Sequence, residues 1–258
     1  FHMRHRWVGW SRDVDGQAGE VGPGRNKGPG VALQFESPQG VVAVRADAVV
    51  LALGGASWPR LGSDGAWVAP LSARGVDVAP LRPANCGFDV QGGWSPFFAS
   101  KFAGLPFKSV AIQVNSPVRA EPAQSPVEGG QAPSRPSESA AAFSRKGEFV
   151  ATATGVEGSL VYAASALLRD AIAADGRATF HIDLLPDVPA AKVQAEVNHP
   201  RGSRSLSSHL KSRLHLDGIK MAVLVEVLGK DGMNDAARLA AAIKHLPITL
   251  GQPRPVAE

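Results

Sequence analysis

An apolar run meets a glycine-rich loop in the stretch Asp47-Ala-Val-Val-Leu-Ala-Leu-Gly-Gly-Ala-Ser-Trp-Pro-Arg-Leu-Gly-Ser-Asp-Gly65. Residues 48–53 are all apolar, which is typical of a strand covered on both faces, usually a parallel strand of an α/β sheet. Gly54 and Gly55 follow at its carboxyl end, the edge where ligands bind in open α/β sheets. Because glycine has no Cβ and adopts positive φ, the pair allows the main chain to approach a ligand. A tight turn without a ligand explains the same pattern equally well.

Short strands precede this run, and the pattern changes after about residue 83. Strands are expected at 6–10, 31–36 and 40–45, as in a β-meander that leads into the strand at Ala48, and a short helix at 65–74 ends at Gly75. In the second region, strands are expected at 86–90, 109–114, 148–152 and 178–184.

Helices dominate the end of the second region. The clearest pattern covers 159–174, with Ser159 as the amino-terminal cap. Its expected apolar stripe consists of Leu160, Ala164, Leu167, Leu168 and Ala171. Three or four helices follow Pro186 and Pro189, and the last one, 234–245, is expected to begin with an Asn or Asp cap.

One segment of the second region, 115–145, has a composition unlike its surroundings. It holds five prolines and six serines with equal numbers of Arg and Glu. Such a segment cannot bury enough apolar surface to offset its ordering entropy. The sequence therefore predicts a disordered insertion, with a recognition tail as the alternative.

A series of motifs resembles the BaiN-like (YhiN-like) NAD(P)/FAD-dependent oxidoreductase family. Residues 52–65 are similar to the family's Ala-Thr-Gly-Gly segment and its Ser-aromatic-Pro continuation, although Leu53 replaces the usual Thr and removes a hydroxyl contact. The further segments, in order, are Pro80-Leu-Arg-Pro-Ala-Asn85, Gly147-Glu-Phe-Val150, Gly155-Val-Glu-Gly-Ser-Leu-Val-Tyr162, His199-Pro-Arg-Gly-Ser-Arg-Ser-Leu206 and Pro253-Arg-Pro-Val-Ala-Glu258. This ordered series covers nearly the whole chain and is more specific than any single motif.

The resemblance implies a fold that combines α/β and α+β parts. A partial FAD-binding, Rossmann-like domain with a β-meander is expected at 1–83, an inserted, substrate-side domain of strands and helices at 84–250, and the start of the return to the FAD domain at 251–258. The residues implied to lie beside the cofactor are Ala52, Gly54, Gly55, Ser57 and Pro59. FAD would be the cofactor and NAD(P)H the co-substrate, with hydride passing through the flavin to an unknown small molecule.

The family's first motif is not found in this sequence. That motif is a G-x-G-x-x-G turn whose following helix receives the FAD pyrophosphate. Residues 22–28 are rich in glycine, but the third Gly is one position late and prolines flank the segment, which favours a surface hairpin loop. We therefore expect an internal fragment of the parent enzyme that is inactive in isolation. No catalytic acid or base is identifiable.

Composition restricts the other classes of function. The formal charge is +4, and the cations are densest at 199–215. Leucines recur there every four residues, which predicts an amphipathic helix with its cations in water, and no aromatic side chain lies between them to stack on bases. A non-catalytic binding module and, less favoured, a nucleic-acid-binding protein that uses the helix at 204–214 remain the alternatives.

Localisation and metal binding follow from what the sequence omits. No apolar run is long enough to span a bilayer and no signal core follows the first residues, so a cytoplasmic location without membrane contact is expected.

Cys86 is the single cysteine, which excludes an internal disulfide and favours a core position. His2 and His5 lack a third ligand nearby, so no metal site is expected. His181 and Asp183 would share one face of a strand and are interpreted as structural.

Overall fold

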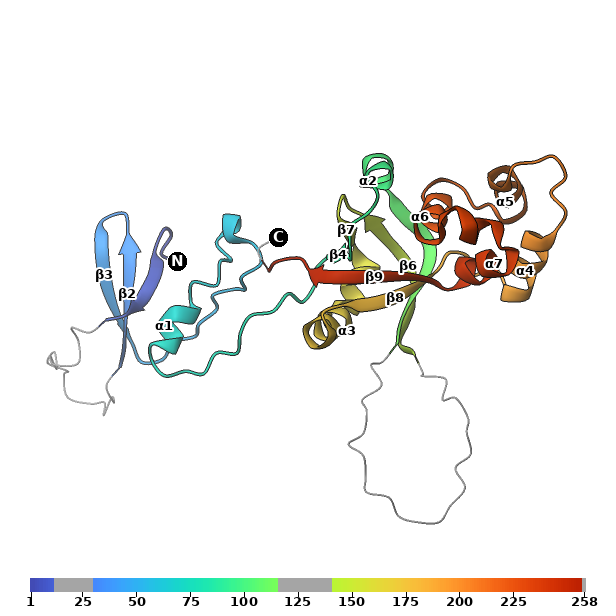
Figure 1. The fold of residues 1–258 in the computed structure, drawn as a ribbon. Helices are drawn as coiled ribbons and strands as arrows, with labels where there is room; N and C mark the ends of the chain where they lie inside the picture. Colours follow the sequence, from blue (N-terminus) through green and yellow to red (C-terminus); the bar gives the residue numbers. More distant parts are fainter. Residues whose placement is uncertain (12–29, 116–140, 257–258) are drawn as a thin grey trace, which may run out of the picture. The chain divides into compact units, whose positions relative to one another are not determined.

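The computed structural model describes residues 1–11, 30–115 and 141–256. The chain divides into two compact units, Phe1–Leu81 (unit 1) and Arg82–Val256 (unit 2), both drawn in Figure 1. None of the helices in the described ranges is long and apolar enough to cross a membrane.

Unit 1 contains a three-stranded antiparallel sheet. Its strands follow one another in space as along the chain: β1 (Arg6–Trp10), β2 (Val31–Ser37) and β3 (Gly40–Ala46). The predicted β-meander is confirmed. Beyond the sheet lie a short 3₁₀ helix, η1 (Pro59–Leu61), and the helix α1 (Val68–Ser72), which is shorter than the predicted 65–74.

The expected strand at 48–53 is wrong. These residues adopt no regular structure, and the Val50 side chain is 90% exposed. A fully apolar run becomes a buried strand only where neighbouring strands take up its hydrogen bonds and other elements cover its faces. In the part of unit 1 that the structure describes, β1 to β3 pair only with one another, and residues 48–53 pair with none of them.

Unit 2 is built on a closed antiparallel barrel. Around the barrel the strands are β4 (Phe88–Val90), β7 (Gly155–Glu157), β6 (Ala141–Ala151), β5 (Pro106–Asn115), β8 (Ala178–Asp183) and β9 (Leu246–Pro253). Alternate residues of β8 are buried, as expected for a strand with one face in a core. Inside, Phe107 stacks on Phe149 at 4.6 Å between ring centroids, and Phe180 meets Phe149 edge-on at 6.0 Å.

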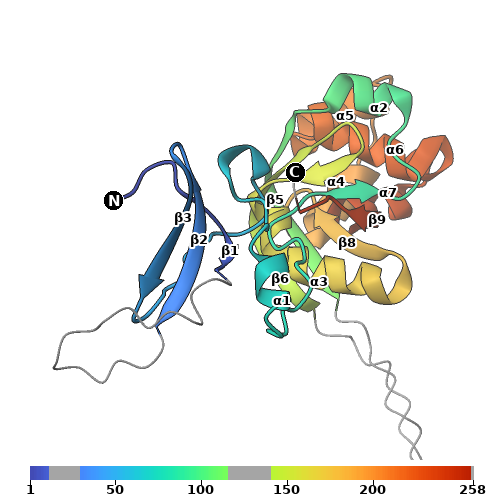
Figure 2. The ribbon, with the colours of Figure 1, turned by 90° about the vertical axis from the view of Figure 1, so that its left-hand side faces the viewer.

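Six helices accompany the barrel in the described part of unit 2. They are α2 (Pro96–Phe102), α3 (Ser159–Asp175), α4 (Ala190–Asn198), α5 (Leu206–Leu214), α6 (Gly218–Asn234) and α7 (Ala236–Lys244). Helix α3 contacts β5 to β9, and α7 contacts β8 and β9. Figures 1 and 2 show α4 to α7 gathered beside the barrel, away from α3. The α+β expectation is confirmed, whereas no parallel Rossmann-like β-α-β unit occurs among the described residues.

The helix predicted at 159–174 is confirmed, but its cap is not. Gly158 occupies the N-cap position, and the Ser159 hydroxyl donates instead to the carbonyl of Glu148 at 3.5 Å. Leu167, expected in the apolar stripe, is 38% exposed because it lies at the edge of that stripe. The predicted Asp cap of the last helix is confirmed: Asp235 accepts hydrogen bonds from the backbone of Ala237 and Arg238.

The prediction of a disordered insertion at 115–145 extends too far at its ends. Asn115 belongs to β5, and 141–145 belong to β6, where Asn115 pairs with Ala141 and Gln113 with Ser144. Composition favoured a loop here, but the hydrogen bonds of the barrel ladder hold these residues in strands. Residues 116–140, and the glycine-rich segment 22–28, lie outside the described residues.

Candidate cofactor site

The glycine loop of unit 1 closes on itself through main-chain hydrogen bonds. Trp58 and Ser63 pair as an isolated bridge around η1, and the amide of Gly65 donates to the carbonyl of Gly55 at 3.3 Å. Gly62 ends η1 with φ of +86°, in the left-handed region that glycine tolerates. The loop is therefore an ordered turn in which glycine is required by the backbone.

A hollow of about 390 Å³ lies beside this loop, and we call it the tryptophan hollow. Its lining includes Trp7, Leu53, Gly62, Asp64, Trp67 and Pro70. The indole nitrogens of Trp7 and Trp67 are buried, and neither has a hydrogen-bond partner among the described residues. A buried donor without an acceptor costs about 1 to 3 kcal/mol, and a bound acceptor would remove that cost. The hollow is thus lined by two indole side chains whose buried N–H groups have no acceptor among the described residues.

The five residues expected beside a cofactor lie on the loop next to this hollow rather than in its lining. Gly54 has φ of +73°, and a Cβ added there would come no closer than 3.9 Å to the Ser63 hydroxyl. A Cβ at Gly55 would lie 3.6 Å from the same hydroxyl. Ala52, Ser57 and Pro59 are exposed, and Pro59 begins η1. The main chain at Gly54 is consequently open to approach by another molecule.

A second hollow, of about 400 Å³, belongs to unit 2. Cys86, Thr154, Tyr162 and Arg254 are among its lining residues. Burial alone would raise the pKa of Asp89, but hydrogen bonds from Thr154 and Gln252 and the Arg254 cation hold that pKa below its usual value. Burial raises the pKa of the Cys86 thiol, so the thiol stays protonated, and the predicted core position of Cys86 is confirmed. This hollow offers hydroxyl groups and one cation, but no activated thiolate.

Comparison with known families adds a second line of evidence. The family model described as HI0933-like protein barrel and H2TH domain matches residues 82–258. The chain belongs to the HI0933-like family. This family is a BaiN-like flavoprotein family, which implies FAD as the cofactor of the family. No curated protein matches the chain.

The matched residues coincide with the barrel and its helices and do not include the glycine loop of unit 1. Membership of the HI0933-like family therefore rests on unit 2, and the placement of cofactor residues at 52–59 remains a prediction. The sequence patterns did not identify Trp7, Trp67 and Tyr162 as candidate binding groups. The pattern around Trp7 indicates only a strand and that around Trp67 only a helix. A signal for Tyr162 existed, since it ends the family-like segment 155–162.

The basic helix at 204–214 forms as α5, with Ser205 rather than Arg204 at its cap. Its cations are engaged: Arg213 pairs with Glu196 at 2.5 Å and Lys211 with Asp217 at 3.2 Å. The Arg204 guanidinium donates to the Ser212 hydroxyl at 3.4 Å. These neighbours compensate much of the positive charge that the sequence presents there.

Two histidines stack on the outer face of the barrel. The rings of His181 on β8 and His245 at the end of α7 lie 3.7 Å apart and 9° from parallel. The Nδ1 atom of His181 is buried and has no hydrogen-bond partner in the described part of the chain. Burial, and then the proximity of His245, lower the pKa of His181. No group of three or more His, Cys, Asp and Glu side chains in the described ranges could hold a metal ion.

The lowered pKa of His181 predicts that acid destabilises unit 2. The unfolded chain binds a proton at this histidine more readily than the folded chain, so stability is complete above the unfolded pKa, about 6.5, and is lost as pH falls below it. We expect the urea midpoint to fall between pH 7.5 and 5.5, and to fall less in His181→Gln. The variant His199→Gln, at an exposed position, is the control, and its urea midpoint should change with pH as that of the wild type does. An equal change of the urea midpoint with pH in all three proteins would contradict the prediction.

Proposed function

We propose that the chain is part of an FAD-dependent oxidoreductase that passes hydride from NAD(P)H through the flavin to a small-molecule substrate. The observation that carries the proposal is membership of the HI0933-like flavoprotein family over residues 82–258. Bound FAD would supply the hydride chemistry. The protein's contribution would be to bind and orient the cofactor and to shape the substrate site.

The residues of unit 1 fit a cofactor with many acceptors. FAD carries carbonyl and phosphate oxygens, and the indole N–H groups of Trp7 and Trp67 have no partner among the described residues. The open main chain at Gly54 allows a planar ring or a phosphate to approach without meeting a side chain. We therefore assign the proposed cofactor contacts to Gly54, Gly55 and the two indoles, with Ala52, Ser57 and Pro59 around them.

The first experiment replaces Gly54 by valine in the parent protein, that is, this chain with the family's flanking FAD segments. A β-branched residue at φ of +73° costs about 1 to 3 kcal/mol, and its side chain would also occupy the space assigned to the cofactor. We expect FAD affinity, measured by quenching of flavin fluorescence, to fall at least tenfold. Ser57→Ala removes at most one hydrogen bond, about 0.5 to 1.5 kcal/mol, and should have the smaller effect.

Gly75→Val is the matched control for backbone strain. Gly75 has φ of +78°, and a Cβ there would meet nothing within 4 Å, so valine suffers similar strain at a position that does not line the tryptophan hollow. FAD affinity should be unchanged in this control. Wild-type affinity in a folded Gly54→Val protein would show that the loop does not face the cofactor.

Mixing the FAD-loaded parent with NADPH or NADH and following flavin bleaching at 450 nm then tests the proposed co-substrate.

A non-catalytic binding module is the alternative function. It predicts that the parent protein, with its flanking segments, purifies without flavin and gains none on incubation with FAD. The 258 residues contain no G-x-G-x-x-G turn. Both the oxidoreductase and the binding module therefore predict that this chain, without the flanking FAD segments, retains no FAD. The discriminating measurement is thus the flavin content of the extended protein.

A further inference from the structure

A largely apolar hollow of about 540 Å³ is lined by α2, the end of α5 and α6, and we call it the phenylalanine hollow. Figures 1 and 2 show α2 beside α6, and the two helices are in contact. The apolar lining includes Phe97, Phe98, Phe102, Met221 and Val225. Sites for small molecules are typically hollows of this size, about 300 to 1,000 Å³, with apolar walls and a few polar groups.

Two apolar side chains of the phenylalanine hollow are exposed to water. Phe97 is 66% exposed and Val225 is 47% exposed. The Phe97 ring meets Phe102 edge-on at 6.3 Å between centroids, and Phe102 lies 5.2 Å from the buried Phe98. An apolar ligand that covers Phe97 and Val225 would remove apolar surface from water, and it would rest on rings that other rings already support.

The polar group with the best-defined position at this hollow is the carboxylate of Glu226. It accepts hydrogen bonds from the backbone N–H of Ser95 at 2.5 Å and from the Ser95 hydroxyl at 2.7 Å. The same hydroxyl oxygen accepts from the amide of Phe98 at 3.2 Å and so caps α2. These bonds fix the carboxylate at the start of the helix that supplies the three phenylalanines.

The negative charge of Glu226 is not balanced by a cation. Its side chain is half-buried, and it makes no ion pair within the residues that the structure describes. The other charged groups of the lining are Lys211 and Asp217, which pair with each other at 3.2 Å. The phenylalanine hollow therefore combines aromatic rings with one carboxylate that has no cationic partner.

We propose that the phenylalanine hollow binds an amphiphilic organic cation, a small molecule with an apolar body and one ammonium group. The ammonium group would meet the Glu226 carboxylate, which has roughly four acceptor positions, of which Ser95 uses two. Aromatic faces also attract cations, so Phe97 and Phe102 favour the same charge. The apolar body would cover Phe97 and Val225. This site belongs to unit 2 and does not depend on the flavin.

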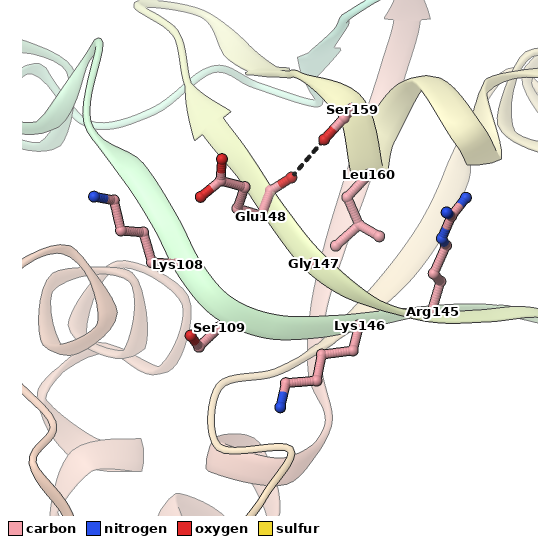
Figure 3. A pocket seen from close by; sticks show the side chains of 8 residues that line it. All are labelled: Lys108, Ser109, Arg145, Lys146, Gly147, Glu148, Ser159 and Leu160. Atoms are coloured by element: carbon pink, nitrogen blue, oxygen red, sulfur yellow. Dashed lines mark hydrogen bonds between the residues drawn. The ribbon is translucent and has the colours of Figure 1, made fainter.

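The cationic hollow at the barrel lacks a common focus of charge. It has a volume of about 500 Å³ and lies at the β-bulge between β5 and β6, where Lys108 and Ser109 together oppose Glu148. Figure 3 shows the side chains of Lys108, Lys146 and Arg145 leaving their strands in different directions. In the phenylalanine hollow, by contrast, the uncompensated charge belongs to one carboxylate whose orientation hydrogen bonds fix.

Calorimetric titration of the full chain with three probes that share one apolar body tests the proposal. The probes are 1-naphthylmethylammonium, 1-naphthalenemethanol and 1-naphthylacetate, which are positive, neutral and negative. We expect saturable binding of the ammonium probe, weaker binding of the alcohol, and a carboxylate affinity at least about tenfold below that of the ammonium. Equal affinities for the three probes, or no saturable binding of the ammonium, would overturn the proposal.

Two variants and a matched control locate the binding. Glu226→Gln keeps an oxygen acceptor for Ser95 but removes the charge, so the ammonium affinity should fall about tenfold and the alcohol affinity should stay. Phe97→Ala should weaken the binding of the ammonium and the alcohol alike, and its exposed position leaves folding unaffected. Asp231→Asn removes an exposed carboxylate of α6 outside the hollow and should bind every probe like the wild type.

The outcomes against the proposal are distinct. Unchanged ammonium affinity in Glu226→Gln, or an equal loss in Asp231→Asn, would show that this carboxylate does not hold the ligand. If Glu226→Gln does not fold, the order of the probes in the wild type and their loss in Phe97→Ala decide. Sedimentation tests a second copy of the chain as the occupant: a dimer that Phe97→Ala dissociates would overturn the proposal, whereas a monomer that binds the ammonium probe supports it.

Discussion

Gly155→Ala is expected to destabilise unit 2 by about 3 kcal/mol or more, the largest effect that we expect of any single substitution in this protein. A Cβ at Gly155 would overlap the carbonyl oxygen of Phe88 and lie 2.7 Å from the Cα of Asp89. Both are backbone atoms of β4, the strand to which β7 is paired, so relief of the overlap requires the strands to separate. The expected readout is a lower urea midpoint with an unchanged dependence on urea concentration.

Gly251→Ala is the matched control within the same barrel. Gly251 belongs to β9, and a Cβ there would lie 3.6 Å from the nearest atom, the Cα of Gln91, which is ordinary contact. The free energy of unfolding of the Gly251→Ala variant should differ from that of the wild type by less than about 1 kcal/mol. If the two variants unfold at the same urea concentration, the close approach of β7 to β4 is not a feature of the folded protein.

Lys244→Met is expected to cost about 2 to 4 kcal/mol, because it removes the ion-pair partner of a largely buried carboxylate. The Lys244 ammonium pairs with Asp183 at 2.7 Å and donates to the carbonyls of Leu185 and Val188 at 2.7 Å each. The two charged side chains are only 18% and 15% exposed, so water replaces the lost partner poorly. These bonds join the end of α7 to the segment that follows β8, and their loss should lower the thermal midpoint of unit 2.

Lys146→Met provides the comparison with an exposed pair. Lys146 and Asp187 also approach to 2.6 Å, but their side chains are 50% and 72% exposed. Exposed pairs contribute at most about 1 kcal/mol, so this variant should unfold close to the wild type. A similar loss of stability in both lysine variants would show that burial does not control the strength of these ion pairs.

Local pattern predicts most of the regular elements. The strands β1 to β3 and β8 agree with the prediction within one residue at each end, and so does the α3 helix, because alternation and helical periodicity record which face is buried. The Asp235 cap is predictable since capping is a contact between neighbours in sequence. In contrast, the apolar run at 48–53 satisfies the pattern of a buried strand and is exposed coil.

The sequence by itself determined the family, the α+β character, the meander and the helical end of unit 2, because these depend on the order and spacing of residues along the chain. Only the tertiary structure decided the barrel closure between β4 and β9, the bulge at Ser109 and the stacking of His181 on His245. It also brought Trp7 and Trp67 to one hollow. Each of these is a contact between residues far apart in sequence. Such contacts depend on the register and closure of strands, which periodicity within one segment does not specify.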